Sequence, residues 1–229
     1  MIASRKHSFI FIKTMKTAGT SVELALSPHC GPEDVITPIS TRHDLQRLKD
    51  DGVAPRNFAP ADVVDRYRKA LKKGNPKLIK RALREDRGRL DTMRAHVTCR
   101  RVREFVGEDF WRAAFKFAVE RHPYEKAVSL AAMNGLSIAD TAFFDLRYVG
   151  YRSYTINDRV AVDYIIRFAD LADDMQTLMA RFGMPWRGLP HARATNRDRR
   201  PAREQLSLQQ RLFIYEMCAL EFELFGWER

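Results

Sequence analysis

Cysteine and long apolar runs are both scarce in this chain of 229 residues. Cys30, Cys99 and Cys218 are widely spaced and form no C-x-x-C pair, so neither a disulfide framework nor a zinc site is expected, and a reducing compartment fits better. No apolar run approaches the roughly 18 residues that a membrane-spanning helix needs. Apolar strand residues begin soon after Met1, so we expect no leader peptide, no anchor and a cytoplasmic protein.

Acidic residues are in deficit as well. The chain has 40 Lys and Arg against 29 Asp and Glu, a formal net charge of +11. This excess favours an acidic partner, such as a nucleic acid, an anionic lipid, a polyanionic sugar or a phosphorylated cofactor. Hydrophobic residues make up 45% of the chain, which excludes wholesale disorder. We expect a single domain over residues 1–229.

One stretch near the N-terminus has the pattern of an anion-binding loop. Residues 9–12 are Phe-Ile-Phe-Ile, a short apolar run typical of a strand buried in a parallel sheet. Residues 22–26 predict the start of a helix, with Thr20 or Ser21 as its cap and Glu23 in its first turn. A loop between a strand and a helix points backbone amides and the helix dipole at a phosphate.

The side chains of this loop suit the same purpose. Gly19 lets the backbone approach an anion without a Cβ in the way, Lys16 supplies positive charge, and Thr20 and Ser21 supply hydroxyl donors. The residue order differs from that of a Walker A loop, G-x-x-x-x-G-K-[ST], whose lysine follows the second glycine. From the loop alone, an ordinary surface turn with a solvated lysine is the alternative.

A second anion site is predicted after a second strand. Residues 115–120, Phe-Lys-Phe-Ala-Val-Glu, are the second predicted strand, and Arg121 follows at its carboxyl end, where ligands bind in open α/β sheets. Pro123 favours the start of a helix there, which places Ser129 between one and two turns along it. An arginine fork beside a hydroxyl suits a phosphate monoester, and a structural ion pair of Arg121 is the alternative.

The remaining pattern alternates strands and helices, which predicts an α/β fold with a parallel sheet. Ser207 begins the last predicted helix, whose Leu208, Leu212, Tyr215, Cys218, Phe222 and Leu224–Phe225 are expected to face the core. Other strands are predicted over residues 34–39 and 162–168, and other helices over 41–50, 101–106, 138–146 and 171–182. From residue 61 a basic helical segment is expected, which Gly74-Asn75-Pro76 divides into two helices.

Both anion-site stretches resemble one enzyme family. Lys-Thr-Ala-Gly-Thr-Ser at residues 16–21 resembles the 5′-phosphosulfate loop of sulfotransferases that use 3′-phosphoadenosine 5′-phosphosulfate (PAPS), especially the carbohydrate branch with the heparan and chondroitin enzymes. Met15 replaces the usual proline. Residues 121–129 resemble the family's 3′-phosphate motif, with His122 and Lys126 as departures. The resemblance covers nearly all the chain except residues 42–94.

The resemblance implies a P-loop-NTPase-like three-layer fold with a central, mainly parallel sheet flanked by helices. It also implies PAPS as donor, 3′-phosphoadenosine 5′-phosphate (PAP) as product, and no metal. His96, in Ala-His-Val at residues 95–97, would take the acceptor proton, while Lys16 would stabilise charge on the departing phosphate. The implied cofactor-binding residues are Lys16, Thr17, Ala18, Gly19, Thr20, Ser21, Arg121, Ser129, Arg197 and Arg200.

The acceptor is expected to be a carbohydrate or another anionic metabolite that offers a hydroxyl or an amine. A basic helical insertion at about residues 42–94, rich in lysines such as Lys72, Lys73, Lys77 and Lys80, is expected to recognise it. A solvated helical face is the alternative. Rival functions are a kinase-like P-loop enzyme and a nucleic-acid-binding module, although the basic run has few aromatics for base stacking. No specific nucleic acid and no membrane span are expected, and the oligomeric state stays open.

Overall fold

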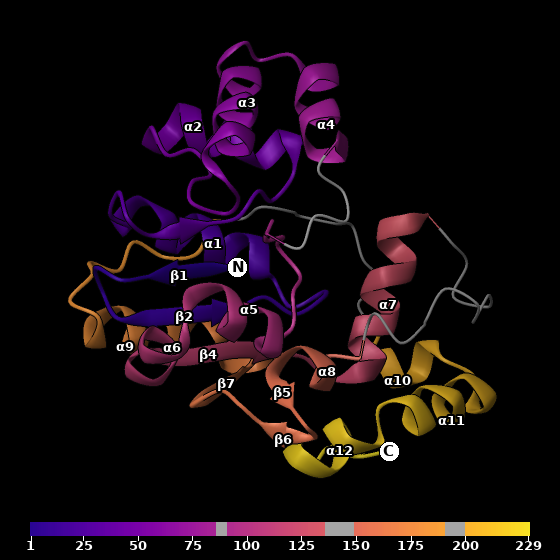
Figure 1. The fold of residues 1–229 in the computed structure, drawn as a ribbon. Coiled ribbons are helices and arrows are strands. Elements are labelled where there is room, and N and C mark those ends of the chain that lie inside the picture. The colour runs from indigo at the N-terminus through magenta and orange to yellow at the C-terminus, as the bar shows by residue number, and fades with distance from the viewer. Residues whose placement is uncertain (86–90, 136–148, 191–199) are drawn as a thin grey trace.

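A computed structural model describes residues 1–85, 91–135, 149–190 and 200–229. Its central sheet has strand order β3-β1-β2-β4-β7 (Figure 1). Its strands are β1 Ile2–Ser4, β2 Phe9–Ile12, β3 Val35–Ile36, β4 Phe115–Glu120 and β7 Tyr164–Arg167. A separate antiparallel hairpin pairs β5 Thr155–Ile156 with β6 Arg159–Val160. The predicted helix over residues 138–146 lies outside the described residues.

The sheet is mixed rather than wholly parallel. β2 pairs in parallel with β4, and β4 pairs in parallel with β7, as the sequence predicts. β1 runs antiparallel to both β2 and β3. The expected parallel character is therefore confirmed for β2, β4 and β7 only. β1 escapes the sequence prediction because three residues before a charged turn carry too little periodicity.

Helices cover both faces of the sheet, which gives three layers. Phe9 and Phe11 of β2 pack on one face with the helices α1 (Gly19–Leu26) and α9 (Leu171–Arg181). Ile10 and Ile12 face the other side, where the core includes residues of α5 and α6. Four alternating residues of one buried strand thus serve two cores, as a continuously apolar strand requires. The other helices are α2 Thr41–Asp51, α3 Ala61–Lys72, α4 Pro76–Glu85, α5 Cys99–Val106, α6 Glu108–Ala113, α7 Pro123–Asn134, α8 Tyr151–Tyr154, α10 Ala202–Gln205, α11 Leu208–Met217 and α12 Ala219–Phe225, with short 3-10 turns η1 Ser27–His29 and η4 Phe168–Asp170.

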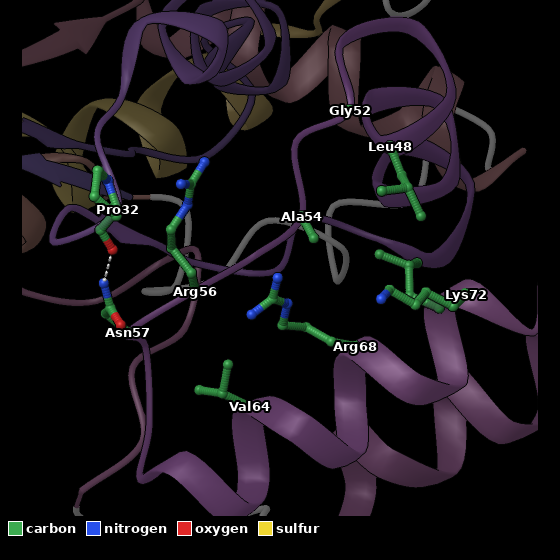
Figure 2. Close-up of a pocket in the computed structure, with 10 residues that line it drawn as sticks. Pro32, Leu48, Gly52, Ala54, Arg56, Asn57, Val64, Arg68 and Lys72 are labelled. Atoms are coloured by element: carbon green, nitrogen blue, oxygen red, sulfur yellow. Dashed lines mark hydrogen bonds between the residues drawn. The ribbon is translucent and has the colours of Figure 1, made fainter.

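Helices α2, α3 and α4 stand together at the top of Figure 1, and the predicted break at residues 74–76 separates α3 from α4. Their apolar side chains join the same core as Ile10 and Ile12. Arg56, Arg68 and Lys72 instead line a cavity of about 300 Å³ that borders α2 and α3 (Figure 2). Part of the insertion's positive charge therefore lines a separate cavity.

The C-terminal segment differs from its prediction. The chain forms two helices, α11 and α12, that meet at Cys218, and Leu208 and Leu212 are 64% and 54% exposed. Cys218, Phe222 and Phe225 are buried as predicted, and Ile214, which the prediction left out, is buried as well; Ile214, Cys218 and Phe222 pack with residues of α7. The expected core positions of Leu208, Leu212 and Leu224 are therefore wrong, because the buried stripe follows the four-residue spacing through Ile214 rather than that through Leu208. None of the described helices is both long and apolar enough to span a membrane.

Candidate functional site

The carboxyl ends of β2 and β4 open onto one cavity of about 620 Å³. Residues 13–21 line it from the β2 side, and Arg121 and Ser129 line it from the β4 side. His96 contributes from the loop that precedes α5. Both predicted anion sites and the predicted base thus share one space, as expected for parallel strands that end at the same edge of a sheet.

Two predicted cofactor residues do not join this group in the described structure. Arg200 is exposed at the surface and is not among the residues that line the cavity. Arg197 lies outside the described residues. The described residues also contain no group of three or more His, Cys, Asp or Glu side chains that could hold a metal ion.

The loop before α1 presents open backbone amides. α1 begins at Gly19, and Ala18 is its N-cap in the left-handed conformation, with φ of 57°. The carbonyl of Ala18 accepts hydrogen bonds from the amides of Ser21 and Val22, at 2.8 and 3.2 Å. Within the described part of the chain, the amides of residues 17–20 donate to no protein group. An anion bound there could accept hydrogen bonds from several of these amides at the positive end of the helix dipole.

The sequence-based assignment of the helix cap is therefore wrong. Neither Thr20 nor Ser21 caps α1, and no side chain makes a cap hydrogen bond. The left-handed backbone at Ala18 turns the chain into the helix without help from a side-chain acceptor. The hydroxyls of Thr20 and Ser21 lie at the cavity instead.

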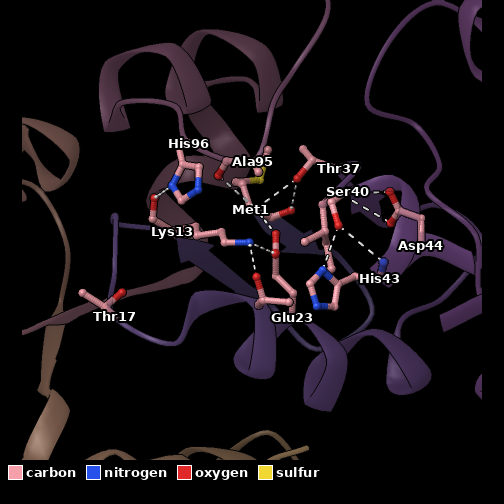
Figure 3. A network of polar contacts seen from close by, with 12 residues as sticks. Met1, Lys13, Thr17, Glu23, Thr37, Ser40, His43, Asp44, Ala95 and His96 are labelled. Atoms are coloured by element: carbon pink, nitrogen blue, oxygen red, sulfur yellow. Dashed lines mark hydrogen bonds and ion pairs between the residues drawn. The ribbon is translucent and has the colours of Figure 1, made fainter. Parts of the chain in front are cut away.

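A buried ion pair lies beneath the loop. The ammonium of Lys13 pairs with the carboxylate of Glu23 and donates to Thr20 Oγ1 at 3.2 Å (Figure 3). The amino group of Met1 binds the second carboxylate oxygen. Burial would raise the pKa of Glu23, but the positive charges of Lys13 and the amino group outweigh it and hold the pKa at about 2. Glu23 is therefore an inward-facing anchor of α1. Because α1 begins at Gly19, Glu23 lies beyond the first turn, and its predicted place in that turn is wrong.

Gly19 is required by this ion pair. A Cβ at Gly19 would lie only 2.7 Å from Lys13 Cγ, so the buried Lys13 side chain runs directly against the glycine. Because Glu23 holds the far end of Lys13, that side chain has little room to move aside. The sequence argument gave Gly19 a role toward an anion, and the structure adds a packing reason for the same residue.

Lys16 also lies at the cavity and is half-buried. Its backbone has a φ of 62°, and its Nζ lies 3.3 Å from Met133 Sδ on α7. Lys13 and Lys16 thus reach the same space from opposite directions, one from below the loop and one beside α7. Lys13 is buried and paired with the carboxylate of Glu23, whereas Lys16 is half-buried.

Arg121 is held in place by two contacts. Its Nε donates to Glu125 Oε2 at 2.8 Å, and its guanidinium lies 4.2 Å from the centre of the Phe168 ring. The predicted alternative of an ion pair is therefore present. Within the described residues, however, the two terminal guanidinium nitrogens donate to no protein group. A fixed fork with an open outer edge, lining the same cavity as the buried Ser129, suits a phosphate oxygen.

The two departures from the family motif have structural roles. His122 is the N-cap of α7, and its Nδ1 accepts a hydrogen bond from the Tyr124 amide at 3.2 Å. The family's Asp or Asn at this place are strong N-cap residues, so histidine performs the same task. Lys126 is buried and pairs with the buried Glu120 at the end of β4. Neither His122 nor Lys126 is among the described residues that line the cavity.

His96 is oriented by the backbone of Lys13. Its Nδ1 lies 3.2 Å from the carbonyl oxygen of Lys13 (Figure 3). A carbonyl only accepts, so Nδ1 carries the hydrogen and Nε2 keeps its lone pair. The His96 side chain is exposed on its cavity side. Desolvation of the ring by the protein around it, and then the positive charges of Lys13 and the Met1 amino group, lower the pKa of His96 from 6.5 to about 4. His96 is therefore neutral near pH 7.

The sequence reasoning missed several residues of the cavity wall, among them Lys13, Ser40 and His43. Lys13 directly follows β2 at the carboxyl edge of the sheet, and that position was the signal that could have identified it. Ser40 and His43 also line the cavity, with Ser40 Oγ 2.8 Å from His43 Nδ1. Ser40 is the N-cap of α2, and a serine before a helix can be recognised in the sequence. No local sequence pattern, however, indicates that Ser40 lies beside the loop of residues 13–21.

Comparisons with known proteins give one distant similarity. No protein-family model matches the chain, and no curated protein matches it. Among solved structures, the chain is similar to the crystal structure of a sulfotransferase from Alicyclobacillus acidocaldarius, with 18% identity and a TM-score of 0.42 over 97% of this chain and 96% of that one. This similarity is too low to transfer the role of any residue.

Proposed function

We propose that this chain is a PAPS-dependent sulfotransferase, which moves a sulfuryl group from PAPS to a hydroxyl or amine of an acceptor. The convergence of two anion positions and a neutral histidine in one cavity carries the proposal. The open amides of residues 17–20, with Lys16, fit a 5′-phosphosulfate. The open edge of Arg121, with Ser129, fits a 3′-phosphate. A kinase-like reading lacks a comparable observation, since this loop has no lysine after a second glycine.

Each residue then has a defined task. The donor, when bound, supplies an activated sulfuryl group. Lys16 and the loop amides stabilise the negative charge that grows on the departing phosphate. His96 takes the acceptor proton on Nε2, because its Nδ1 hydrogen is engaged by the Lys13 carbonyl. Lys13 is a positioning residue, since it holds the His96 ring through its carbonyl and the loop through its ammonium.

PAP is expected to stabilise the protein more than adenosine 5′-phosphate, which lacks the 3′-phosphate. Arg121→Ala should weaken PAP binding by about 10- to 100-fold, because it removes charged hydrogen bonds to that phosphate. Thermal shift and titration calorimetry measure both effects. The matched control is Arg167→Ala at the end of the neighbouring strand β7, whose guanidinium donates to the Phe225 carbonyl at 2.9 Å. Equal stabilisation by the two nucleotides would contradict the role given to Arg121.

Lys16→Ala is expected to lower turnover by about a hundredfold, as loss of one preorganised donor to a developing anion does. Its effect on PAP affinity should be smaller, because the loop amides of residues 17–20 remain. Steady-state kinetics combined with PAP titration separate the two. Wild-type turnover in this variant would mean that the amides alone stabilise the departing phosphate.

A further inference from the structure

A second cavity, of about 410 Å³, adjoins the first at His96 and Ile39, which line both. It lies between α3, α4 and the loop of residues 92–96. Its wall is mainly apolar and includes Phe58, Val63, Ala82, Leu83 and Met93. A space of this size, apolar and open to a candidate base, matches the usual properties of a small-molecule site.

The polar residues of this cavity are few, namely Tyr67, Arg84, Thr92, Arg94 and His96, and its charged side chains are all positive. The Tyr67 hydroxyl already donates to Asp44 at 2.7 Å, so Tyr67 offers the cavity a ring rather than a hydrogen bond. Arg84 and Arg94 are exposed members of the lining. None of the described lining residues is acidic. The cavity therefore combines an apolar interior with two cations.

The lysines of the insertion lie elsewhere. Lys72 faces the hollow shown in Figure 2, with Arg56 and Arg68, and Lys73 lines a groove on the outer side of α3 and α4. Neither of these hollows includes His96 among its described lining residues. The side chains that reach the space beside His96 are thus mostly apolar, in contrast to the overall charge of α3 and α4.

We propose that the acceptor is an amphipathic alcohol or phenol that carries an acidic group, an inference that rests on the proposed function. Its apolar body binds between α3 and α4, its acid lies at Arg84 and Arg94, and its hydroxyl reaches His96. A sugar would bring many hydroxyls against Phe58 and Met93, where they would lose water without gaining hydrogen bonds. In the reaction the acceptor oxygen bonds to sulfur as the bond from sulfur to the 5′-phosphate oxygen breaks, and the hydroxyl proton passes to Nε2 of His96.

Three probes separate the apolar and acidic contributions. Binding of 10-hydroxydecanoate, 1,10-decanediol and glucuronate is measured by calorimetry with the full chain, with and without PAP. We expect 10-hydroxydecanoate to bind most tightly, the diol about tenfold or more weakly, and glucuronate more weakly still. Preference for glucuronate over 10-hydroxydecanoate would overturn the inference. Failure of the wild-type chain to bind PAP would overturn the proposed function. Binding of 10-hydroxydecanoate without PAP tests this cavity independently of that function.

Two leucines of α4 provide a matched pair of variants. Leu83 lines the cavity beside His96, whereas Leu78 is 38% exposed and lines the outer groove. Leu83→Glu should weaken 10-hydroxydecanoate binding by tenfold or more, because it places an anion against the apolar wall and the probe's own acid. Leu78→Glu should change it by less than twofold, and both variants should keep PAP affinity. Equal effects of the two substitutions would overturn the assignment of the cavity.

A second pair keeps the test decisive if Leu83→Glu does not fold. Arg84→Ala should weaken the binding of 10-hydroxydecanoate but not of the diol, because only the former carries a carboxylate. Lys80→Ala, on the same helix and also exposed, is the control and should change neither. An equal loss for both probes, or no loss for either, would contradict the role of Arg84.

Discussion

His96→Ala is expected to lower turnover by about 10²- to 10⁴-fold, the usual contribution of a positioned general base. The affinity for PAP should stay within about twofold of the wild type, since the anion positions lie on residues 16–21 and at Arg121 and Ser129. Rapid-quench or steady-state assays with PAPS, together with PAP titration, measure both quantities. His43→Gln is the matched control, because His43 is the second described histidine in the same wall. A loss in His43→Gln as large as that in His96→Ala would reassign the base.

The pH dependence of the same step follows from the state of His96. Only its neutral form accepts a proton, so the rate falls as pH drops through its pKa. That pKa is lowered from 6.5 to about 4 in the free protein, and the negative charge of a bound donor raises it again. We therefore expect a flat rate from about pH 7 to 8. Below that range the rate should fall, with its midpoint between the pKa of about 4 in the free protein and the ordinary value of 6.5. A rate already falling from pH 8 to 7 would point to a different group.

Lys126→Met is expected to lower the free energy of unfolding by about 3 to 5 kcal/mol, the typical effect of removing one partner of a buried ion pair. Lys126 and Glu120 are both buried, and the buried Glu221 lies near enough for Glu120 to raise its pKa further, after burial itself. Without the ammonium, the two carboxyl groups keep amide donors, from Arg121 to Glu120 and from Tyr151 to Glu221, but they lose the positive charge that balances them. Urea unfolding at neutral pH measures the loss.

Two further measurements test this explanation. Burial and the neighbouring Glu120 raise the pKa of Glu221, so the native state keeps its proton to a higher pH than the unfolded chain does. Stability should therefore fall as pH rises, and the loss in Lys126→Met should be larger at pH 8 than at pH 5. Adding Glu120→Gln to Lys126→Met should recover part of the loss, because it removes the unpaired charge. Stability within 1 kcal/mol of the wild type at pH 8 would contradict a buried, charged pair.

The local parts of the site could be predicted from the sequence. Each anion position is a strand, a short loop and the start of a helix, so its signal lies within about a dozen neighbouring residues. The parallel pairing of β2 and β4 fits their largely apolar, buried sequences, and it places residues 16–21 and Arg121 at one edge. His96 required the family resemblance, because no local pattern distinguishes it from a packed histidine.

The non-local parts could not be predicted. The contact of Lys13 with Gly19, and its ion pair with Glu23, depend on how a strand end sits under a helix start. The apolar wall beside His96 collects Phe58, Val63 and Met93, which no spacing rule connects. In the sequence, the many lysines of α3 and α4 were the most prominent feature. Exposed charged residues, however, do not indicate which face of a helix points toward the cavity. Only the packing of α3 and α4 decides which side chains face the cavity.

The left-handed backbone of the anion loop has a consequence for the thermodynamics of ligand capture. Lys16 and Ala18 hold φ values of 62° and 57°, which cost an L-residue about 1 to 2 kcal/mol each. Glycine would relieve that cost, but it would also let the loop sample conformations in which the amides of residues 17–20 diverge. With side chains at both positions, and with Lys13 anchored beneath, the loop loses its conformational entropy during folding. An arriving anion therefore meets amides that are already ordered, and little of its binding free energy is consumed in ordering them.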